Sequence, residues 1–147
     1  MTFRLVACER TGQPFEQLEA LPDAILEICQ ATAEHYDRTG FDLPWIGYLA
    51  LDGEVVVGGG AFVGPPEDDR VEIAYFTLPE HQSQGYATRT AARLISIARE
   101  VSPTLEIYAK TAPEPGPSTA VLTRLGFRRI GAAIDHEIGE AWAWLLT

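Results

Sequence analysis

The stretch Gln82-Ser83-Gln84-Gly85-Tyr86-Ala87 lies between a strand-like run at residues 71–78 and a strongly helical run at residues 87–100. The first N–H groups of a helix have no intrahelical partners, and the helix dipole adds partial positive charge at the same end. Gly85 lets the backbone come close to a ligand because it has no Cβ, and the small Ala87 lets the helix start close to its strand. The stretch therefore predicts a turn that binds a phosphate-bearing ligand.

A glycine between a strand and a helix is often only a turn, so the surrounding pattern matters. The pattern is Gln-x-x-Gly-x-Ala, after a strand that ends in Leu78-Pro79-Glu80 and before a long helix rich in alanine, arginine and leucine. It differs from a Walker loop because no Lys-Ser or Lys-Thr pair follows the glycine. It differs from the dinucleotide-binding fingerprint because only one of that motif's three glycines is present.

The chain of 147 residues fits one domain, residues 1–147, with one hydrophobic core. Its hydrophobic content of 46% and mean hydropathy of −0.01 are typical of a soluble globular protein. No apolar run approaches the roughly 20 residues of a membrane span, and no signal peptide is visible. Cys8 and Cys29 have no metal-ligand spacing, so we expect reduced thiols, a cytoplasmic location, no bound metal and no membrane partner.

The formal net charge is −10, from 21 acidic and 11 basic residues. This excess of acid argues against nucleic acid as a partner, because neutralising phosphates needs clustered lysine and arginine. An acidic surface can favour the approach of a cationic amine, but in many proteins it only maintains solubility.

Alternating or continuous apolar runs, typical of strands, recur through the chain. They predict strands at residues 3–8, 45–51, 54–63, 71–78, 105–109, 127–134 and 140–146. Asp52-Gly53 is a strong hairpin turn between the second and third of these strands. Gly58-Gly59-Gly60 inside the third strand predicts a bulge or a close approach between backbones.

Helical spacing of apolar residues marks three further regions. It predicts helices within residues 15–36, 87–100 and 118–125. Pro22 interrupts the first region, which predicts two helices or one kinked helix, with Asp23 opening the second. Ser118 is in position to cap the last helix, and Gly126 is in position to end it. The middle helix connects the fourth and fifth strands, which we expect to be parallel through a right-handed crossover.

The resulting order, β-α-α-β-β-β-α-β-α-β-β, resembles that of the GNAT superfamily of N-acetyltransferases over nearly the whole chain. The matching pieces are residues 71–76, the Gln82 to Ala87 turn, residues 118–127 and residues 139–144. The chain is most similar to the branch that acetylates the N-termini of ribosomal proteins and to its relatives of unknown substrate. The resemblance implies an α/β (α+β) fold with a mixed, mostly antiparallel central sheet flanked by helices.

In this superfamily the fourth and fifth strands splay apart and hold the pantetheine of acetyl-CoA. The resemblance therefore implies acetyl-CoA as the cosubstrate, with its pantetheine paired to the backbone of Phe76, Thr77 and Leu78. It also implies that the pyrophosphate binds the turn, through Gln82, Gln84, Gly85, Tyr86, Ala87 and Thr88.

Glu72 is the leading candidate for the base that removes a proton from the amine. It lies in a strand whose odd-numbered residues share one face and whose even-numbered residues share the other. A carboxylate in an apolar strand is costly unless it has a partner or a function, and partial burial would raise its pKa toward neutral pH. The alternatives are a solvent-facing side chain or an ion pair with Arg70.

The other candidate site residues come from the resemblance. Glu106 lies on the fifth strand, where other members carry a catalytic glutamate, and the alternative is an exposed strand residue. His35 and Tyr36 end the helix that walls the acceptor pocket in this fold, although Tyr36 would fit the core equally well.

Two positions depart from the superfamily. Pro115 stands where members often have asparagine, and Leu122 stands where many have a tyrosine as the general acid. Proline lacks the amide side chain, and leucine has no proton to donate. Ser118 or a water molecule would then protonate the leaving thiolate, or the amine would do so itself.

We therefore expect an enzyme that transfers an acetyl group from acetyl-CoA to the primary amine of a small molecule or of a peptide or protein N-terminus. The alternatives are an acyl-CoA-binding sensor or partner module without turnover, and a structural domain that binds no CoA. We also expect a homodimer, because Trp142 and Trp144 alternate on one strand face and would present aromatic area to a partner. The alternative is that both tryptophans cover the core of their own chain.

Overall fold

The computed structural model of the protein describes residues 2–18 and 21–147. Along the chain the elements are β1 (Phe3–Ala7), α1 (Asp23–Thr39), β2 (Gly47–Asp52), β3 (Val55–Phe62), β4 (Arg70–Thr77), a short 3-10 helix η1 (Pro79–His81), α2 (Tyr86–Val101), β5 (Glu106–Thr111), α3 (Pro117–Arg124), β6 (Arg128–Asp135) and β7 (Gly139–Leu146). All predicted strands and the last two predicted helical regions are confirmed, with small shifts at their ends.

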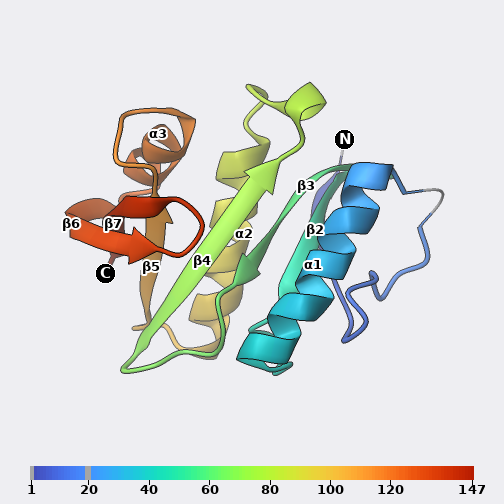
Figure 1. The fold of residues 1–147 in the computed structure, drawn as a ribbon, viewed down its shortest axis with the longest axis horizontal. Helices are drawn as coiled ribbons and strands as arrows, with labels where there is room; N and C mark the ends of the chain where they lie inside the picture. Colours follow the sequence, from blue (N-terminus) through green and yellow to red (C-terminus); the bar gives the residue numbers. More distant parts are fainter. Residues whose placement is uncertain (1, 19–20) are drawn as a thin grey trace.

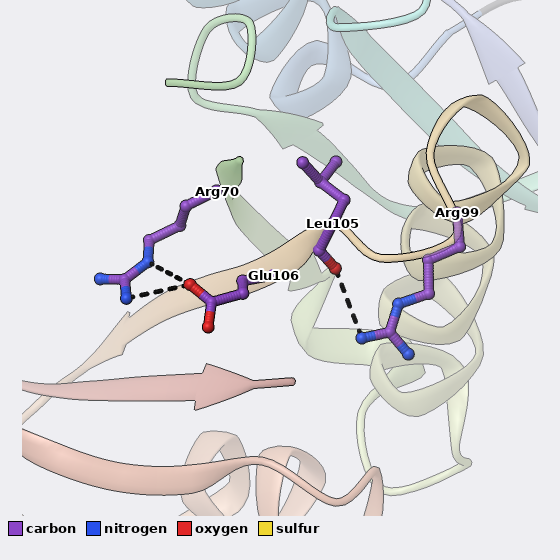
Figure 2. Close-up of polar contacts among 4 residues, drawn as sticks. All are labelled: Arg70, Arg99, Leu105 and Glu106. Atoms are coloured by element: carbon purple, nitrogen blue, oxygen red, sulfur yellow. Dashed lines mark hydrogen bonds and ion pairs between the residues drawn. The ribbon is translucent and has the colours of Figure 1, made fainter. Parts of the chain in front are cut away.

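The described strands form one seven-stranded sheet in the order β1-β2-β3-β4-β5-β7-β6. Neighbouring strands are antiparallel except β4 and β5, which are parallel because α2 carries the chain back between them. At the end of this crossover, Nη2 of Arg99 donates a 3.4 Å hydrogen bond to the carbonyl of Leu105 (Figure 2). The sheet is thus mixed and mostly antiparallel, as predicted.

The first predicted helical region is only partly correct. One helix, α1, forms there, and it begins directly after Pro22. Before it, Pro14 forms an isolated β-bridge with Cys8, and the Phe15 N–H donates to a β1 carbonyl at 2.9 Å. Backbone groups that pair with β1 are not free to form a helix, so the described residues before Pro22 are not helical. Residues 19 and 20 of this region lie outside the described residues.

Helices cover both faces of the sheet, with α1 in front of it and α2 behind it in Figure 1. The core cluster on the α2 face includes Val71, Ile73, Leu94, Ile107 and Leu122. The cluster on the α1 face includes Ile25, Cys29, Leu49, Leu51 and Leu78. None of the helices in the described residues is both long and apolar enough to span a membrane.

The three glycines of β3 are confirmed as a place of close approach. A β-bulge interrupts the pairing of β2 and β3 next to Gly58. A Cβ on Gly58 would clash with the carbonyl of Phe76, and a Cβ on Gly60 would lie 2.9 Å from the side chain of Leu94. Side chains at these positions would push β4 and α2 away from β3, so the glycines allow these elements to pack closely.

The C-terminal hairpin uses its tryptophans for the protein's own core. Trp144 is 7% exposed, and its Nε1 donates a 3.0 Å hydrogen bond to Oγ1 of Thr111. Trp142 packs against the same cluster, and the guanidinium of Arg129 lies 4.0 Å from the centroid of its ring. Trp144 therefore belongs to the protein's own core, which disagrees with the expectation for this residue, and Trp142 is partly buried against the same cluster.

Candidate functional site

The two parallel strands of the sheet separate after three ladder pairs. β4 pairs with β5 only from Arg70 to Glu72, and the last pair joins Glu72 to Tyr108. Beyond this pair, which we call the vertex, β4 continues along β3 while β5 continues along β7. Residues 73–77 therefore form an edge without a strand neighbour on this side in the described part of the chain, and this is the splay that the resemblance implies.

The backbone groups along the splayed edge alternate in direction. Leu78 directs its N–H to β3, where the carbonyl of Val57 accepts it at 2.8 Å, and its own carbonyl is bonded within the following turn. By alternation Phe76 also faces β3, whereas Tyr75 and Thr77 face the splay. The backbone groups of Phe76 and the N–H of Leu78 are therefore directed to β3 and not to the splay, which disagrees with the pantetheine contacts expected for these two residues, while those of Tyr75 and Thr77 face the splay.

A cleft of about 640 Å³ opens at this edge, between β4, the turn before α2 and the start of α3. Its walls include Tyr75, Phe76, Thr77, Gln82, Gly85, Ala87, Ser118 and Arg124. Gln84, Tyr86 and Thr88 are not among the residues that line the cleft, and their role in binding the pyrophosphate stays a prediction.

A buried polar atom of the cleft wall lacks a hydrogen bond. The Oγ1 atom of Thr77 is inaccessible to solvent and has no partner among the described residues. Buried hydroxyl groups are nearly always hydrogen-bonded in proteins, so this atom is an exception in the cleft wall.

The turn before α2 leaves three helix N–H groups without intrahelical partners. The first bond of the helix runs from the Arg89 N–H to the carbonyl of Gly85 at 3.1 Å, so the N–H groups of Tyr86, Ala87 and Thr88 precede it. Gly85 is the N-cap and has φ 86° and ψ 5°. A Cβ built on Gly85 would have no atom within 4 Å, so a side chain there would meet no steric clash within the chain. Glycine is favoured at this position because φ is positive. This geometry suits an anion.

The side chain of Tyr86 points away from the cleft and anchors the turn. Its hydroxyl donates a 2.6 Å hydrogen bond to Oδ2 of Asp52, and its ring stacks on Phe3 with the centroids 6.2 Å apart. Gln82 braces the turn on the cleft side, where its Nε2 donates to the carbonyl of Thr77 at 3.3 Å. The Tyr86 contact ties the turn to β2, and the Gln82 contact ties it to β4.

Glu72 lies at the vertex with its side chain 23% exposed. Its Oε2 is 3.5 Å from Nζ of Lys110, which in turn is 3.7 Å from Oδ2 of Asp135. Burial raises the pKa of Glu72, and the Lys110 ammonium opposes this rise. Glu72 is therefore neither a free solvent-facing residue nor the partner of Arg70, because Lys110 is its partner.

Glu106 lies at the other end of the parallel ladder, away from the splay. Its Oε1 accepts hydrogen bonds from Nε and Nη2 of Arg70 at 3.3 and 3.2 Å (Figure 2). The sequence pattern paired Arg70 with Glu72 as an alternative, but the register of β4 and β5 places Arg70 directly beside Glu106.

Ser118 lines the cleft but does not cap α3. The N-cap is Gly116, and the Thr119 hydroxyl closes the first turn with 2.9 Å bonds to the N–H and the carbonyl of Gly116. The carbonyl of Ser118 accepts a 3.4 Å hydrogen bond from the Tyr75 hydroxyl. Burial raises the pKa of Tyr75 to about 12, so its phenol stays protonated at neutral pH. Tyr75 was not identified as a site residue from the sequence. The available signal was its position two residues before Thr77, on the same side of the same strand.

A second cavity, of about 420 Å³, begins at the vertex on the α1 face of the sheet. Glu72 and Tyr108 form one part of its wall, and Arg70 and the β3–β4 turn form another. The last turn of α1 contributes Arg38 and Thr39. We call this space the vertex cavity.

Tyr36 does not reach the vertex cavity. It is 5% exposed, its hydroxyl donates to the Cys8 carbonyl at 2.8 Å, and the same oxygen accepts the Gly47 N–H at 2.9 Å. Both hydrogen-bonding functions of the phenol are thus used inside the core. The expectation that Tyr36 contacts a substrate is therefore wrong.

His35 also lies outside the wall of the vertex cavity. Its Nε2 is 3.4 Å from the carbonyl oxygen of Phe62. The residues of α1 that do line the cavity, Arg38 and Thr39, follow His35 by one helical turn. Their spacing of three and four residues from His35 was the signal that could have identified them.

The two positions that depart from the superfamily pattern provide no proton donor in the structure. Leu122 is fully buried in the core beneath α3, and Pro115 is exposed in the loop before it. Neither side chain can donate a proton in the cleft. No group of three or more His, Cys, Asp or Glu side chains within residues 2–18 and 21–147 could hold a metal ion.

A family model described as an acetyltransferase (GNAT) domain matches residues 9–128. No curated protein matches the sequence significantly. A GNAT-family acetyltransferase from Bacillus anthracis is 21% identical, with a TM-score of 0.58 over 68% of this chain and 64% of that one. A spermidine N-acetyltransferase SpeG chimera from Vibrio cholerae and hSSAT is 17% identical, with a TM-score of 0.69 over 98% and 94% of the two chains. RimL, a ribosomal L7/L12 alpha-N-protein acetyltransferase, is 16% identical, with a TM-score of 0.70 over 99% and 92%. At these identities the likeness shows a shared fold.

Proposed function

Because this chain belongs to the GNAT acetyltransferase family, we propose that it transfers the acetyl group of acetyl-CoA to a primary amine. The acceptor is a small molecule or the N-terminus of a peptide or protein. The observation that carries the proposal is the splay of β4 and β5, which has a cleft of about 640 Å³ toward α3 and a cavity of about 420 Å³ toward α1. Two ligands can therefore approach the vertex from opposite faces of the sheet.

The cleft suits acetyl-CoA, whose thioester supplies an activated acetyl group. The N–H groups of Tyr86, Ala87 and Thr88, at the positive end of α2, would bind its pyrophosphate, and Arg124 adds a cation to the same wall. The open backbone edge at Tyr75 and Thr77 can pair with the amide groups of pantetheine as it would with a neighbouring strand.

Glu72 is the proposed general base. Amines are mostly protonated at neutral pH and must lose a proton before they attack a thioester. A carboxylate at the vertex with a raised pKa is suited to accept that proton, directly or through one water molecule. Glu106 is less suited because Arg70 already holds its carboxylate.

Tyr75 is the proposed general acid that protonates the departing CoA thiolate. Tyr75 lines the cleft, and its phenol carries a proton at neutral pH. It supplies the function that Leu122 cannot perform. The same proton is donated to the Ser118 carbonyl in the structure, so the hydroxyl would have to turn from Ser118 to the thiolate during the reaction.

The transfer is proposed to be direct, from the thioester to the amine. An acyl-enzyme would need a reactive thiolate, but Cys8 and Cys29 are 1% and 0% exposed in the cluster beneath α1. Burial raises the pKa of Cys8 to about 12 and also raises that of Cys29, so both remain thiols. Two free thiols also support a reducing, cytoplasmic location as a proposal.

The acceptor class has support from the fold neighbours. Two of them are named for acetylating spermidine and a ribosomal protein N-terminus, and both acceptors are amines. A place in the ribosomal-protein branch is a finer proposal, which rests on the sequence resemblance alone.

One observation favours a second function, the binding of acyl-CoA without turnover. Leu122, at the position of the family's acid, is fully buried and apolar. Incubation with acetyl-CoA and a panel of primary amines and peptides, with detection of free CoA thiol, separates the two functions. Amine-dependent CoA release that Glu72→Gln lowers supports the transferase. Calorimetric binding of acetyl-CoA without release, whatever the acceptor, would instead support the sensor.

We also propose a homodimer formed through the β6–β7 hairpin. Its support comes from Ile130, Ile134 and Ile138, which are 46%, 78% and 54% exposed on edge strand β6 and its turn. Exposed apolar side chains gathered at one edge are typical of contact surfaces. Light scattering at tens of micromolar protein tests this proposal. A dimer that Ile134→Asp dissociates is expected, and a wild-type monomer would contradict it.

A further inference from the structure

We infer that the vertex cavity selects amines that also carry a carboxylate or phosphate group. The inference rests on the proposed transferase activity, because it names the acceptor class of that same site. Its basis is the charge arrangement of the cavity wall, in which the Glu72 carboxylate stands at the vertex and Arg38, Arg70 and Glu67 are the other charged residues.

The end of the cavity at the vertex suits one ammonium group. Glu72 attracts it to the point where the splay begins, which is where the thioester is proposed to lie. Lys110 lies against the same carboxylate at 3.5 Å and already offsets part of its charge, so Glu72 can attract no more than one further ammonium group. The acceptor amine is thus fixed at one end, and the rest of the molecule extends toward the outer wall.

Arg70 is the first guanidinium of that outer wall. Its Nε and Nη2 donate to the same oxygen of Glu106, as Figure 2 shows. A guanidinium has five N–H donors, so three remain for a ligand. Glu106 also holds the group in place, and the Arg70 side chain is 42% exposed, which leaves it accessible.

Arg38 is the second guanidinium, and it comes from the last turn of α1. It is exposed and lies within 4.0 Å of no carboxylate among the described residues, so its charge is available. Arginine binds carboxylate and phosphate through paired, charge-assisted hydrogen bonds. Two arginines on different elements that face one cavity therefore form a site for an anionic group.

Glu67 supports the main alternative, a polyamine acceptor. It lies on the β3–β4 turn, lines the same cavity and makes no ion pair with a described residue, so it could hold a second ammonium. The two arginines oppose this by like-charge repulsion. With Arg38 and Arg70 against Glu67 and Glu72, the formal charges of the wall cancel, which suits a zwitterion better than a polycation.

The test compares acceptors that differ mainly in this anionic group. The probes are β-alanine, its carboxamide, aminoethylphosphonate and spermidine, each with saturating acetyl-CoA and with free CoA thiol as the readout. We expect kcat/KM for β-alanine or the phosphonate to exceed that for the carboxamide by about tenfold, the worth of one charge-assisted contact. The order of β-alanine and the phosphonate then distinguishes a carboxylate site from a phosphate site.

The variant Arg38→Gln tests whether the preference for an anionic acceptor comes from the vertex cavity. We expect it to lower the ratio of kcat/KM for β-alanine over the carboxamide by about tenfold, mainly through KM. Arg128→Gln is the matched control, since Arg128 is exposed on β6, outside the cavity wall, and makes no ion pair with a described residue. It removes the same charge and should leave the ratio unchanged.

The outcomes separate this inference from the activity on which it rests. An unchanged ratio in Arg38→Gln, or a wild-type preference for the carboxamide or spermidine, would overturn the inference and leave the transferase activity standing. Absence of CoA release with every acceptor would contradict the transferase activity itself, and the inference with it.

Discussion

The hydroxyl of Tyr86 donates a 2.6 Å hydrogen bond to Oδ2 of Asp52, which ties the first residue of α2 to the last residue of β2. Asp52 is 7% exposed, and its Oδ1 has no hydrogen-bond partner among the described residues. The same bond raises the pKa of Tyr86, so the phenol keeps the proton that it donates to Asp52. The contact therefore positions the turn whose N–H groups are proposed to bind the pyrophosphate.

Tyr86→Phe should weaken acetyl-CoA binding and lower the melting temperature. The variant leaves the Asp52 carboxylate without its donor and frees the first turn of α2. Tyr48→Phe is the matched control, because it removes a 2.7 Å hydroxyl bond to the Pro44 carbonyl away from this turn. Calorimetry should find weaker binding only in Tyr86→Phe, and equal affinities in the two variants would contradict the anchoring role.

Glu72→Gln should lower kcat by about 10²-fold while acetyl-CoA affinity stays the same, because the amide cannot accept the amine's proton. Steady-state kinetics and calorimetry measure the two quantities. Glu106→Gln is the comparison, since its carboxylate is already bonded to Arg70. If turnover fell in Glu106→Gln and not in Glu72→Gln, the role of base would belong to Glu106.

Lys110→Met should move the acid limb of the kcat/KM profile to higher pH. Burial raises the pKa of Glu72 and Lys110 opposes that rise, so removing the ammonium leaves the pKa higher still. A base with a higher pKa becomes protonated, and inactive, at a higher pH. Lys110→Arg keeps the charge and should keep the limb near its original position. Identical profiles for Lys110→Met and the wild type would exclude Glu72 as the group that titrates.

Tyr75→Phe should lower kcat by about 10²-fold without a matching loss of acetyl-CoA affinity, because the proposed proton donor for the CoA thiolate is then absent. Its phenol bonds only a backbone carbonyl, at 3.4 Å, so the fold should tolerate its loss. The measurement is kcat in parallel with calorimetric affinity for acetyl-CoA. A full-rate Tyr75→Phe enzyme would leave protonation of the thiolate to water or to the amine itself.

The parts of the molecule that follow local rules were predictable. Alternation along β4 predicted two faces, and Val71 and Ile73 are both 2% exposed beneath α2 while Glu72 lies on the other side. The order strand, Gly85, helix predicted the free N–H groups, because any helix that starts there leaves them unpaired.

The parts that depend on distant partners were not predictable. Glu72 meets Lys110 only through the register of two parallel strands, and a sequence pattern does not contain that register. The helical spacing before Pro22 does not produce a helix there, because the Phe15 N–H donates to a carbonyl of β1. Tyr36 turned inward because the Cys8 carbonyl and a second backbone group satisfy its hydroxyl in the core.

The central claim is that the cleft beside the splay and the start of α2 bind acetyl-CoA, and calorimetry on two glycine variants tests it most directly. Gly85→Glu places bulk and negative charge where the pyrophosphate is proposed to lie. Gly139→Glu is the matched control, because Gly139 also has a positive φ, 80° against 86°, has no atom within 4 Å of its Cβ position, and is the first residue of β7, outside the cleft wall. We predict that the wild type and Gly139→Glu bind acetyl-CoA with similar affinity and that Gly85→Glu shows no binding. Unchanged affinity in Gly85→Glu would contradict the assignment of the site.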